Sequence, residues 1–230
     1  NHNYKVCNEN TKESIFLKIY NHKKNIKKIL NLYKLGYGSK ILYTFENGRI
    51  EKWIEHKVLK YEDLNKNIIV KIANLFKKFH NDTNMSHNDL NFNNIIIKEN
   101  GELTFIDFEY SGSLNIYYDI ANFFCEWMYD YKSDEWYKYN LKNFPSMTYI
   151  KLFCSTYLKT KDITIITNFI KKVLNEIPNV HKFWINWANN YNSIDYNLYK
   201  FYRKKLLDIN FNELVKEKII YIYIYIYIIK

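Results

Sequence analysis

The stretch HNDLNFNNIIIKENGELTFIDFEY, residues 87–110, constrains the fold of this chain more than any other feature. Two runs rich in β-branched and apolar residues, 94–98 and 103–107, flank the tetrapeptide ENGE. Asn100-Gly101 suits a two-residue type I′ turn, because both central positions of that turn need a positive φ. The stretch is therefore predicted to fold as a β-hairpin that ends at Asp107.

The turn also predicts the register of this hairpin. With Asn100 and Gly101 at the tip, counting down the ladder places Asn94 opposite Asp107. Directly paired Cβ atoms lie about 4.5–5.5 Å apart, so the amide oxygen and the carboxylate can bind one cation. Mg²⁺ prefers such oxygen ligands together with substrate phosphates. The sequence therefore predicts a magnesium and phosphate site at Asn94 and Asp107.

Asp89 precedes Asn94 by five residues and is predicted to lie in a loop. A carboxylate there can orient or deprotonate a substrate hydroxyl beside the metal, which is typically worth about 10²–10⁴-fold in rate. The alternative is that Asp89 caps a turn and Asn94 ends a strand. The predicted pairing of Asn94 with Asp107 favours the catalytic interpretation.

Strand-like patterns come before this hairpin and helical patterns after it. Four elements are predicted upstream: a strand at 14–20, a helix at 25–36, a hairpin at 40–54 around Asn47-Gly48 and an amphipathic helix at 62–81. Residues 117–210 carry mostly helical patterns rich in aromatic side chains. These patterns predict an α+β fold, with a small strand-rich N-terminal lobe and a larger, mostly helical C-terminal lobe.

The basic composition points to no nucleic-acid partner. The formal net charge is +10 and 19% of the residues are aromatic, but the lysines are dispersed and no nucleic-acid-binding motif is present. The joint overuse of Lys, Asn, Ile and Tyr is typical of an A/T-rich genome. A solvated basic surface is therefore the favoured interpretation of the charge.

The cysteines and the two termini favour a cytoplasmic protein without a membrane span. The three cysteines form no CxxC pair, which favours free thiols in a reducing compartment. The polar N-terminus lacks the apolar core of a signal peptide. The Ile-Tyr repeat at 219–229 is shorter than the roughly 17–25 apolar residues of a membrane span, and is expected to be a low-complexity tail outside the fold.

The central motifs resemble those of the choline/ethanolamine kinases. HNDLNFNN followed by IDFE is similar to the H-x-D-x-x-x-x-N and D-F-G pattern of protein kinases, with Asn88 and Glu109 where protein kinases have Arg and Gly. SHNDLNFNNIII, FIDFEYSGS and YDIANFFCEWMYDY are most similar to the small-molecule family, from about residue 4 to 205. The resemblance implies a protein-kinase-like fold and ATP- and Mg²⁺-dependent phosphorylation of choline. Ethanolamine, or both substrates, is the alternative.

The resemblance implies roles for individual residues. Asp89 would be the catalytic base, and Asn94 and Asp107 would hold Mg²⁺ with the ATP phosphates. Lys18 matches the basic residue that contacts these phosphates from a strand of the small lobe. Further binding residues are implied: Trp53, Ile54 and Glu55 at a hinge that contacts adenine, and Glu109 and Tyr110 near the phosphates or the substrate.

Choline carries a permanent cation that donates no conventional hydrogen bond, so aromatic faces and a nearby carboxylate hold it best. The matching family positions imply such a cage, formed by Glu126, Tyr131, Trp184 and Trp187 and completed by Phe201 or a nearby tyrosine. Trp184 and Trp187 are three residues apart and share a face on a helix. The alternative is that these rings pack in a core. FFCEWMYDY is more similar to the choline kinases, which favours choline over ethanolamine.

Two features of the family are lacking in this sequence. The glycine-rich loop that covers the phosphates is not present, and NHKKNIKKILNLYKLG has no acidic residue to pair with Lys18. A truncated N-lobe is therefore expected over 1–56, followed by a C-lobe over 57–211 and a tail over 212–230. Because both missing parts position ATP, a non-catalytic kinase-like paralogue is a further alternative. A homodimer is left open.

Overall fold

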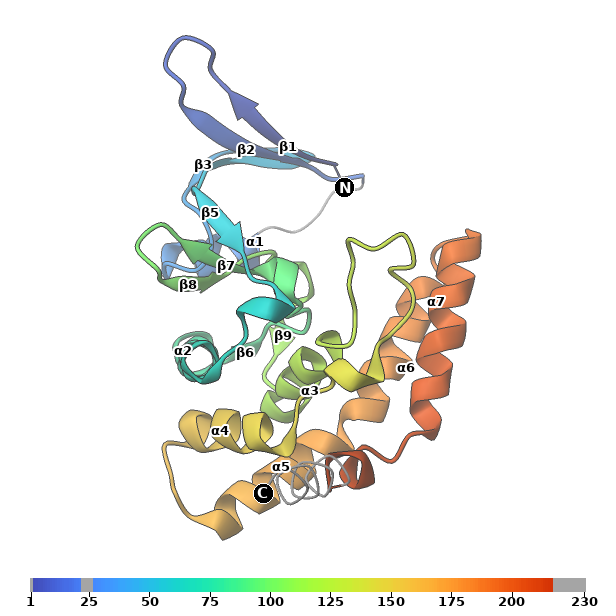
Figure 1. The fold of residues 1–230 in the computed structure, drawn as a ribbon. Helices are drawn as coiled ribbons and strands as arrows, with labels where there is room; N and C mark the ends of the chain where they lie inside the picture. The colour runs from blue at the N-terminus through green and yellow to red at the C-terminus, as the bar shows by residue number, and fades with distance from the viewer. Residues whose placement is uncertain (1, 22–26, 217–230) are drawn as a thin grey trace. The chain divides into compact units, whose positions relative to one another are not determined.

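The computed structural model describes residues 2–21 and 27–216, and these form two compact units (Figure 1). Unit 1 comprises Asn1–Leu59 and Asn93–Tyr110, and unit 2 comprises Lys60–Phe92 and Ser111–Lys230. The boundary after Leu59 lies close to the one expected after residue 56. The hairpin at 93–110, which was assigned to the C-lobe from the sequence, belongs with the N-terminal segment instead.

Unit 1 begins with a four-stranded antiparallel sheet in the order β1-β2-β4-β3. Its strands are β1 (His2–Cys7), β2 (Ser14–Ile19), β3 (Ile41–Phe45) and β4 (Gly48–Lys52). The expected strand at 14–20 is thus the second of the sheet, and Lys18 lies directly opposite Arg49 of β4. Two basic side chains therefore start from neighbouring positions on the same face of the sheet.

The β3–β4 turn differs from the expected one by one residue. Phe45 pairs with Gly48, so Glu46 and Asn47 are the two loop residues and Gly48 is already in β4. A Cβ atom at Gly48 would collide with the Lys18 carbonyl and the Phe45 ring. This glycine is required by close strand packing and not by a left-handed turn.

Helix α1 (Lys27–Lys34) buries the side chains of Ile29 and Leu32. It ends near Gly36, whose φ of 88° suits a helix C-terminus. The helix was expected over 25–36, and Ile26, counted on its apolar face, lies outside the described residues.

A second sheet of unit 1 contains β5 (His56–Val58), β7 (Ile95–Lys98) and β8 (Leu103–Phe105), in the order β5-β7-β8. The short 3₁₀ helix η2 (Phe92–Asn94) precedes β7, and η3 (Phe108–Tyr110) follows β8. Pairing of β5 with β7 ties residues 56–58 to residues 96–98. That long-range pairing explains why the hairpin groups with the N-terminal segment.

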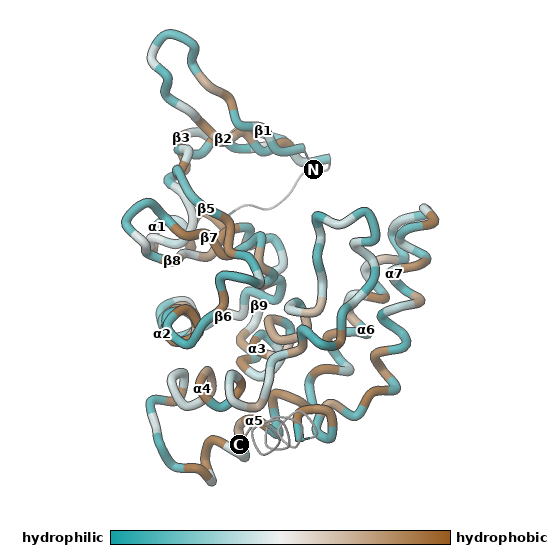
Figure 2. Tube along the Cα trace, in the orientation of Figure 1, coloured by the Kyte–Doolittle hydropathy of each residue, from teal (hydrophilic) through white to brown (hydrophobic). Residues whose placement is uncertain are grey.

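Unit 2 is mostly helical. Its longer helices are α2 (Lys66–Thr83), α3 (Ile116–Glu126), α4 (Met147–Leu158), α5 (Ile163–Asn175), α6 (Ile177–Ala188) and α7 (Ile194–Lys205). The shorter elements are η1 (Tyr61–Asp63), β6 (Met85–Ser86), β9 (Gly112–Ser113), η4 (Leu141–Asn143) and η5 (Leu206–Asp208). Hydrophobic residues recur at intervals along the helices, with hydrophilic residues between them (Figure 2). Helices that bury one face are expected to show this pattern.

Side-chain caps and an aromatic core hold these helices. Five helices have a side-chain N-cap. First-turn N–H groups of α2, α3, α4, α5 and α7 donate hydrogen bonds to the side chains of Asn65, Asn115, Ser146, Asp162 and Ser193, in that order. Phe76, Phe123 and Phe153 meet at the centre, with ring centroids 5.3–5.8 Å apart. Within the described ranges, every helix is too short or too polar to cross a lipid bilayer.

The C-terminal part of unit 2 extends beyond the expected end of the fold at residue 211. Residues 211–216 are helical, the Phe211 ring contacts that of Phe144 at 4.8 Å between centroids, and Val215 is 1% exposed. The Ile-Tyr repeat at 219–229 lies outside the described residues. The two units together confirm the predicted fold class, α+β with a strand-rich N-terminal part and a mostly helical C-terminal part.

Candidate active site

Lys18 on β2 is the centre of a buried charged cluster in unit 1. Its ammonium group lies 2.8 Å from Asp107 Oδ1 and 2.5 Å from Glu109 Oε1. Lys18 is 3% exposed and Glu109 9%, whereas the Asp107 side chain keeps 35% of its surface exposed. One cation therefore faces two carboxylates, and the half-exposed Asp107 can still bind a further cation. We call these three residues the Lys18 cluster.

The predicted register of the 94–107 hairpin was wrong by one residue. Ile95 pairs with Phe105 and Ile97 with Leu103, so Asn94 does not face Asp107 across the ladder. The loop has three residues, 99–101, because Lys98 N donates to Glu102 O at 2.9 Å. Such a loop places its last residue in the left-handed region, and Gly101 has a φ of 76°.

Two irregular segments bring Asn94 and Asp107 to one place instead. Asn94 ends η2 and its carbonyl accepts a hydrogen bond from Ile106 N at 3.0 Å. Asp107 then adopts a φ of 61°, which is uncommon for a residue other than glycine. Phe108, buried against Tyr33 and Tyr37 at 5.9 and 6.5 Å between ring centroids, anchors this strained position. Backbone strain held in this way is typical of functional sites.

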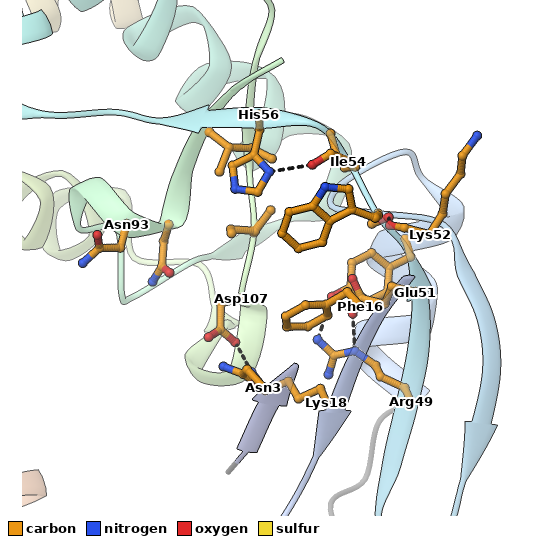
Figure 3. A pocket seen from close by; sticks show the side chains of 16 residues that line it. Asn3, Phe16, Lys18, Arg49, Glu51, Lys52, Ile54, His56, Asn93 and Asp107 are labelled. Atoms are coloured by element: carbon orange, nitrogen blue, oxygen red, sulfur yellow. Dashed lines mark hydrogen bonds and ion pairs between the residues drawn. The ribbon is translucent and has the colours of Figure 1, made fainter. Parts of the chain in front are cut away.

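Asn94 and Asp107 line one cavity of unit 1, with a volume of about 330 Å³ (Figure 3). That volume is at the lower end of the range for small-molecule sites. The cavity lining contains the charged residues Lys18, Arg49, Glu51 and Asp107, and the apolar or aromatic residues Phe16, Trp53, Ile54, Ile96 and Ile106. A ligand that carries both charged groups and a flat apolar group matches this mixed lining.

The predicted hinge residues divide between the cavity and the surface. Trp53 and Ile54 line the cavity, and the Ile54 carbonyl is 2.6 Å from His56 Nδ1. The buried Trp53 Nε1 has no hydrogen-bond partner among the described residues. Glu55 points elsewhere, because it forms an exposed ion pair with Lys5 at 3.3 Å. Trp53 Nε1 is thus a donor available to a bound molecule.

Arg49 and Glu51 of β4 form a second buried charged group beside Lys18. Arg49 Nε donates to Glu51, and Arg49 Nη2 donates to the Tyr33 hydroxyl at 2.9 Å. Burial and the Glu51 carboxylate raise the pKa of Tyr33, so its hydroxyl stays protonated and donates to Glu51 at 3.1 Å. Through Tyr33 this group connects α1 to the sheet, although the described part of α1 has no acidic residue.

In unit 2, Asp119 of α3 holds the loop that carries Asp89. Its carboxylate accepts hydrogen bonds from His87 N at 2.8 Å and Asn88 N at 2.7 Å. His80 Nε2 lies 2.9 Å from the same carboxylate. Asn88 has a φ of 67°, so the backbone turns sharply just before Asp89. The half-buried Asp89 accepts from Asn91 Nδ2 at 3.3 Å.

Unit 2 also brings Glu126, Tyr131 and Trp184 together around an arginine that the sequence reasoning missed. Arg203 Nη2 donates to Glu126 Oε1 at 2.6 Å, and the Tyr131 hydroxyl donates to Glu126 Oε2 at 2.5 Å. The guanidinium lies 4.4 Å from the Tyr129 ring centroid and 5.8 Å from that of Trp184. Arg203 is fully buried and Glu126 is 2% exposed.

A group of half-buried rings adjoins this ion pair, and we call it the aromatic patch: Tyr131, Trp136, Trp187 and Tyr196. Trp136 and Tyr196 are 5.3 Å apart between centroids, Trp187 and Tyr196 5.6 Å, and Tyr131 and Trp136 6.4 Å. Trp187 also contacts Trp184 at 5.5 Å, and Trp184 Nε1 donates to Asn122 Oδ1 at 2.8 Å.

The structure does not bring Phe201 to the aromatic patch. Phe201 is 51% exposed and lies against Lys205 and Tyr202. The nearby tyrosine that contacts the patch is Tyr199, which is buried and lies 5.4 Å from Trp136 between ring centroids. The signal was present in the sequence, because Tyr196, Tyr199 and Arg203 follow the i, i+3, i+7 spacing of one helix face. Tyr110 belongs to unit 1, next to Glu109 of the Lys18 cluster.

The sequence profile described as choline/ethanolamine kinase matches residues 4–83 and 79–208, which is most of the chain. This chain belongs to the choline/ethanolamine kinase family. A probable choline kinase of Arabidopsis thaliana is 31% identical over 137 residues, which cover 55% of this chain and 39% of that protein. An ethanolamine kinase of Saccharomyces cerevisiae is 30% identical over 116 residues, 44% of this chain and 22% of that protein. These alignments thus span well under half of either relative.

Among solved structures, an ethanolamine kinase of Plasmodium vivax superposes on this family member with a TM-score of 0.73. The superposition covers 89% of this chain and 78% of that one, at 22% sequence identity. At that identity the likeness concerns the fold. It agrees with the protein-kinase-like architecture expected from the motifs.

Asp107 and Glu109 of the Lys18 cluster offer carboxylate oxygens, the kind of ligand that Mg²⁺ prefers. Lys18, Asp107 and Glu109 together carry one excess negative charge, and the 8% exposed Asn94 lines the same cavity as Asp107. Across residues 2–21 and 27–216, no group of three or more His, Cys, Asp or Glu is arranged to hold a metal. Mg²⁺ needs no such group, because one or two carboxylates, substrate phosphates and water complete its coordination.

Proposed function

We propose that this protein transfers the terminal phosphoryl group of ATP to the hydroxyl group of choline, giving phosphocholine and ADP. The Lys18 cluster carries the proposal, because it sets one buried cation between two carboxylates at the wall of a cavity. Phosphoryl transfer depends mostly on positioning and on charge stabilisation. A buried lysine and carboxylates that can hold a divalent cation supply both.

Lys18 and Arg49 would face the ATP phosphates, since both line the cavity and both are nearly fully buried. In a poorly hydrated site, each cation stabilises phosphate charge more strongly than it does in water. Asn94 and Asp107 would hold Mg²⁺, which, when bound, neutralises charge on the transferred group. Adenine would lie against the apolar residues of the cavity lining, which include Trp53, whose Nε1 lacks a partner among the described residues.

Asp89 would act as the general base. Its carboxylate accepts the proton of the choline hydroxyl, the hydroxyl oxygen bonds to the terminal phosphorus, and the bond from that phosphorus to the bridging oxygen breaks to release ADP. Asp119 supports this role indirectly, because it fixes the backbone of His87 and Asn88 immediately before Asp89. Geometry of this kind keeps a base in place without contacting the substrate.

The aromatic patch would bind the trimethylammonium group of choline. Electron-rich ring faces attract a cation that cannot donate hydrogen bonds. Ethanolamine is the second candidate substrate, because one of the relatives, from yeast, is named an ethanolamine kinase. A soluble cytoplasmic enzyme, acting alone or as a homodimer, fits the proposal.

Turnover with and without the Asp89 carboxylate tests the function. Purified protein with MgATP and choline should form phosphocholine, and Asp89→Asn should lower kcat by about 10²-fold or more, since general-base catalysis is worth about 10²–10⁴-fold. Phosphocholine is measured directly by phosphorus NMR, with ethanolamine assayed in parallel. Asp82→Asn is the matched control, because Asp82 is an exposed residue of α2 paired with Lys78.

Each result bears on one alternative. Formation of phosphoethanolamine without phosphocholine would replace the proposed substrate and leave the phosphotransferase in place. If neither product depends on Asp89 while Asp82→Asn behaves like the unaltered protein, the non-catalytic kinase-like alternative is the better description.

A further inference from the structure

Both oxygens of the Glu126 carboxylate are already engaged within unit 2. Oε1 accepts from Arg203 Nη2 at 2.6 Å, and Oε2 accepts from the Tyr131 hydroxyl at 2.5 Å. Arg203 Nη2 also lies 3.3 Å from the Tyr131 hydroxyl oxygen. Glu126 is only 2% exposed. Its charge is therefore compensated inside the protein, and little of its surface is open to an incoming cation.

The partners of Arg203 keep it charged and fixed. Burial opposes the charge of Arg203, but Tyr129, Tyr199 and Glu126 more than offset this and raise its pKa. The guanidinium lies 4.8 Å from the Tyr199 ring centroid and 4.4 Å from that of Tyr129. His181 Nδ1 accepts from Arg203 Nη1 at 3.3 Å. An arginine held from all these sides remains paired with Glu126.

The consequence concerns which substituted ammonium groups can bind at the aromatic patch. A primary ammonium has three N–H donors, and moving it out of water is costly unless acceptors replace the water. A trimethylammonium has no N–H donor and interacts well with ring faces alone. Both oxygens of the Glu126 carboxylate already accept hydrogen bonds from Arg203 and Tyr131, so this carboxylate is a poor replacement for the water around a primary ammonium.

We propose that Arg203 determines substrate selectivity: by holding Glu126 in an internal ion pair, it favours a trimethylammonium group over a primary ammonium group at the aromatic patch. This inference rests on the proposed function, because it names the feature that separates choline from ethanolamine. Arg203 acts through Glu126 and is a positioning residue.

Tyr131→Phe tests the inference with the smallest change, because it keeps the ring of the patch and removes the hydroxyl that engages Glu126 Oε2. Tetramethylammonium and methylammonium chloride are titrated into the full chain, with tryptophan fluorescence as the signal. The unaltered protein should bind tetramethylammonium more tightly. In Tyr131→Phe the ratio of the two affinities should move toward methylammonium by about tenfold, the value of one hydrogen bond to a charged group.

Two further variants complete the design. Tyr202→Phe makes the same change on α7, where Tyr202 stacks on Tyr137 outside the patch, and should leave the ratio unchanged. Arg203→Lys keeps the charge but loses the planar fork that contacts Glu126, Tyr131 and His181, so it should move the ratio in the same direction as Tyr131→Phe. Arg203→Lys replaces Tyr131→Phe as the test variant if circular dichroism shows that Tyr131→Phe does not fold.

The outcomes separate this inference from the proposed function. An unaltered protein that binds methylammonium as tightly as tetramethylammonium would overturn the selectivity role, as would a ratio that neither Tyr131→Phe nor Arg203→Lys changes. Choline and ethanolamine turnover is measured on the same samples. Shifted affinity ratios without any turnover would support the role of Arg203 and count against the phosphotransferase.

Discussion

At the scale of single residues, Arg203 and Glu126 form an ion pair that could be recognised only from the folded structure. Glu126 was expected to face a ligand, and the structure pairs it with an arginine 77 residues away in the sequence. A fully buried ion pair contributes little net stability, but breaking it leaves an uncompensated charge in the interior. The two residues should therefore behave as one unit in unfolding experiments.

A double-mutant cycle measures this coupling. Arg203→Met should destabilise the protein by about 3–5 kcal/mol, because Glu126 is left charged and buried. Adding Glu126→Gln should recover part of that loss, because the unpaired charge is removed. Urea unfolding of the two single variants and the double variant gives the coupling free energy. The exposed pair Lys5–Glu55 is the control and should couple only weakly; simple additivity at Arg203 and Glu126 would contradict this account.

Some residue assignments needed more than the sequence. The sequence pointed to Asp107 and Lys18 through their motifs, and the structure brings them within 2.8 Å. Phe201 and Tyr199 are both aromatic residues of α7, and only burial separates the exposed one from the one that contacts Trp136. In a chain with 23 tyrosines and 15 phenylalanines, residue type alone could not choose between them.

At the scale of elements, the existence of the hairpin at 94–107 was predictable and its register was not. Asn100-Gly101 fits a two-residue turn with two positive φ angles, but it also fits a three-residue loop in which only the glycine is left-handed. The second form is observed, with Gly101 at a φ of 76° and Asn100 Oδ1 accepting from Glu102 N at 3.0 Å. A dipeptide compatible with both loops leaves the register open by one residue.

The loop that carries Asp89 depends on α3, and Asp119→Asn tests that dependence. An amide has one acceptor oxygen, so it cannot serve His87 N, Asn88 N and His80 as the carboxylate does. If the proposed function holds, kcat should fall by about tenfold to a hundredfold, the cost of a misplaced catalytic group. Independently of activity, hydrogen exchange at the amides of His87 and Asn88 should accelerate.

The control for this loop is Asp134→Asn, because Asp134 is exposed. It should change neither the turnover nor the exchange rates. Unchanged exchange at His87 and Asn88 in the folded Asp119→Asn protein would mean that the two hydrogen bonds do not hold the loop.

At the scale of the whole molecule, the sequence predicted two parts but divided them differently. The chain order places residues 93–110 after the helix at 66–83, so they were assigned to the C-terminal part. The structure groups them with residues 1–59, because β5 pairs with β7. Strand pairing between distant segments depends on side-chain packing across the sheet, which local patterns do not contain.

The stability of the folded protein should depend on pH through His181. Burial and the neighbouring Arg203 lower the pKa of His181, whereas in the unfolded chain it titrates near its ordinary value of about 6.5. The folded protein therefore keeps its full free energy of unfolding, as far as His181 is concerned, above about pH 6.5. As the pH falls below that value, the unfolded chain takes up a proton that the folded chain does not, and the free energy of unfolding falls by about 1.4 kcal/mol per pH unit.

Urea unfolding, followed by tryptophan fluorescence at about pH 7.5 and about pH 5.5, measures this loss. His181→Gln has no such titration and should show a smaller difference between the two conditions. Equal differences in the variant and the unaltered protein would show that other groups cause the pH dependence.

The guanidinium of Arg203 among Tyr129, Tyr199 and Trp184 has a consequence for the cost of ligand binding. These rings already surround a permanent cation, so their side chains are ordered before any ligand arrives. Ordering a flexible side chain on binding costs about 0.5–1.5 kcal/mol. Tyr199 and Trp184 also support Trp136 and Trp187 of the aromatic patch. An internal arginine thus lets the protein meet part of this entropic cost during folding, and a small cation binds to a surface that is already arranged.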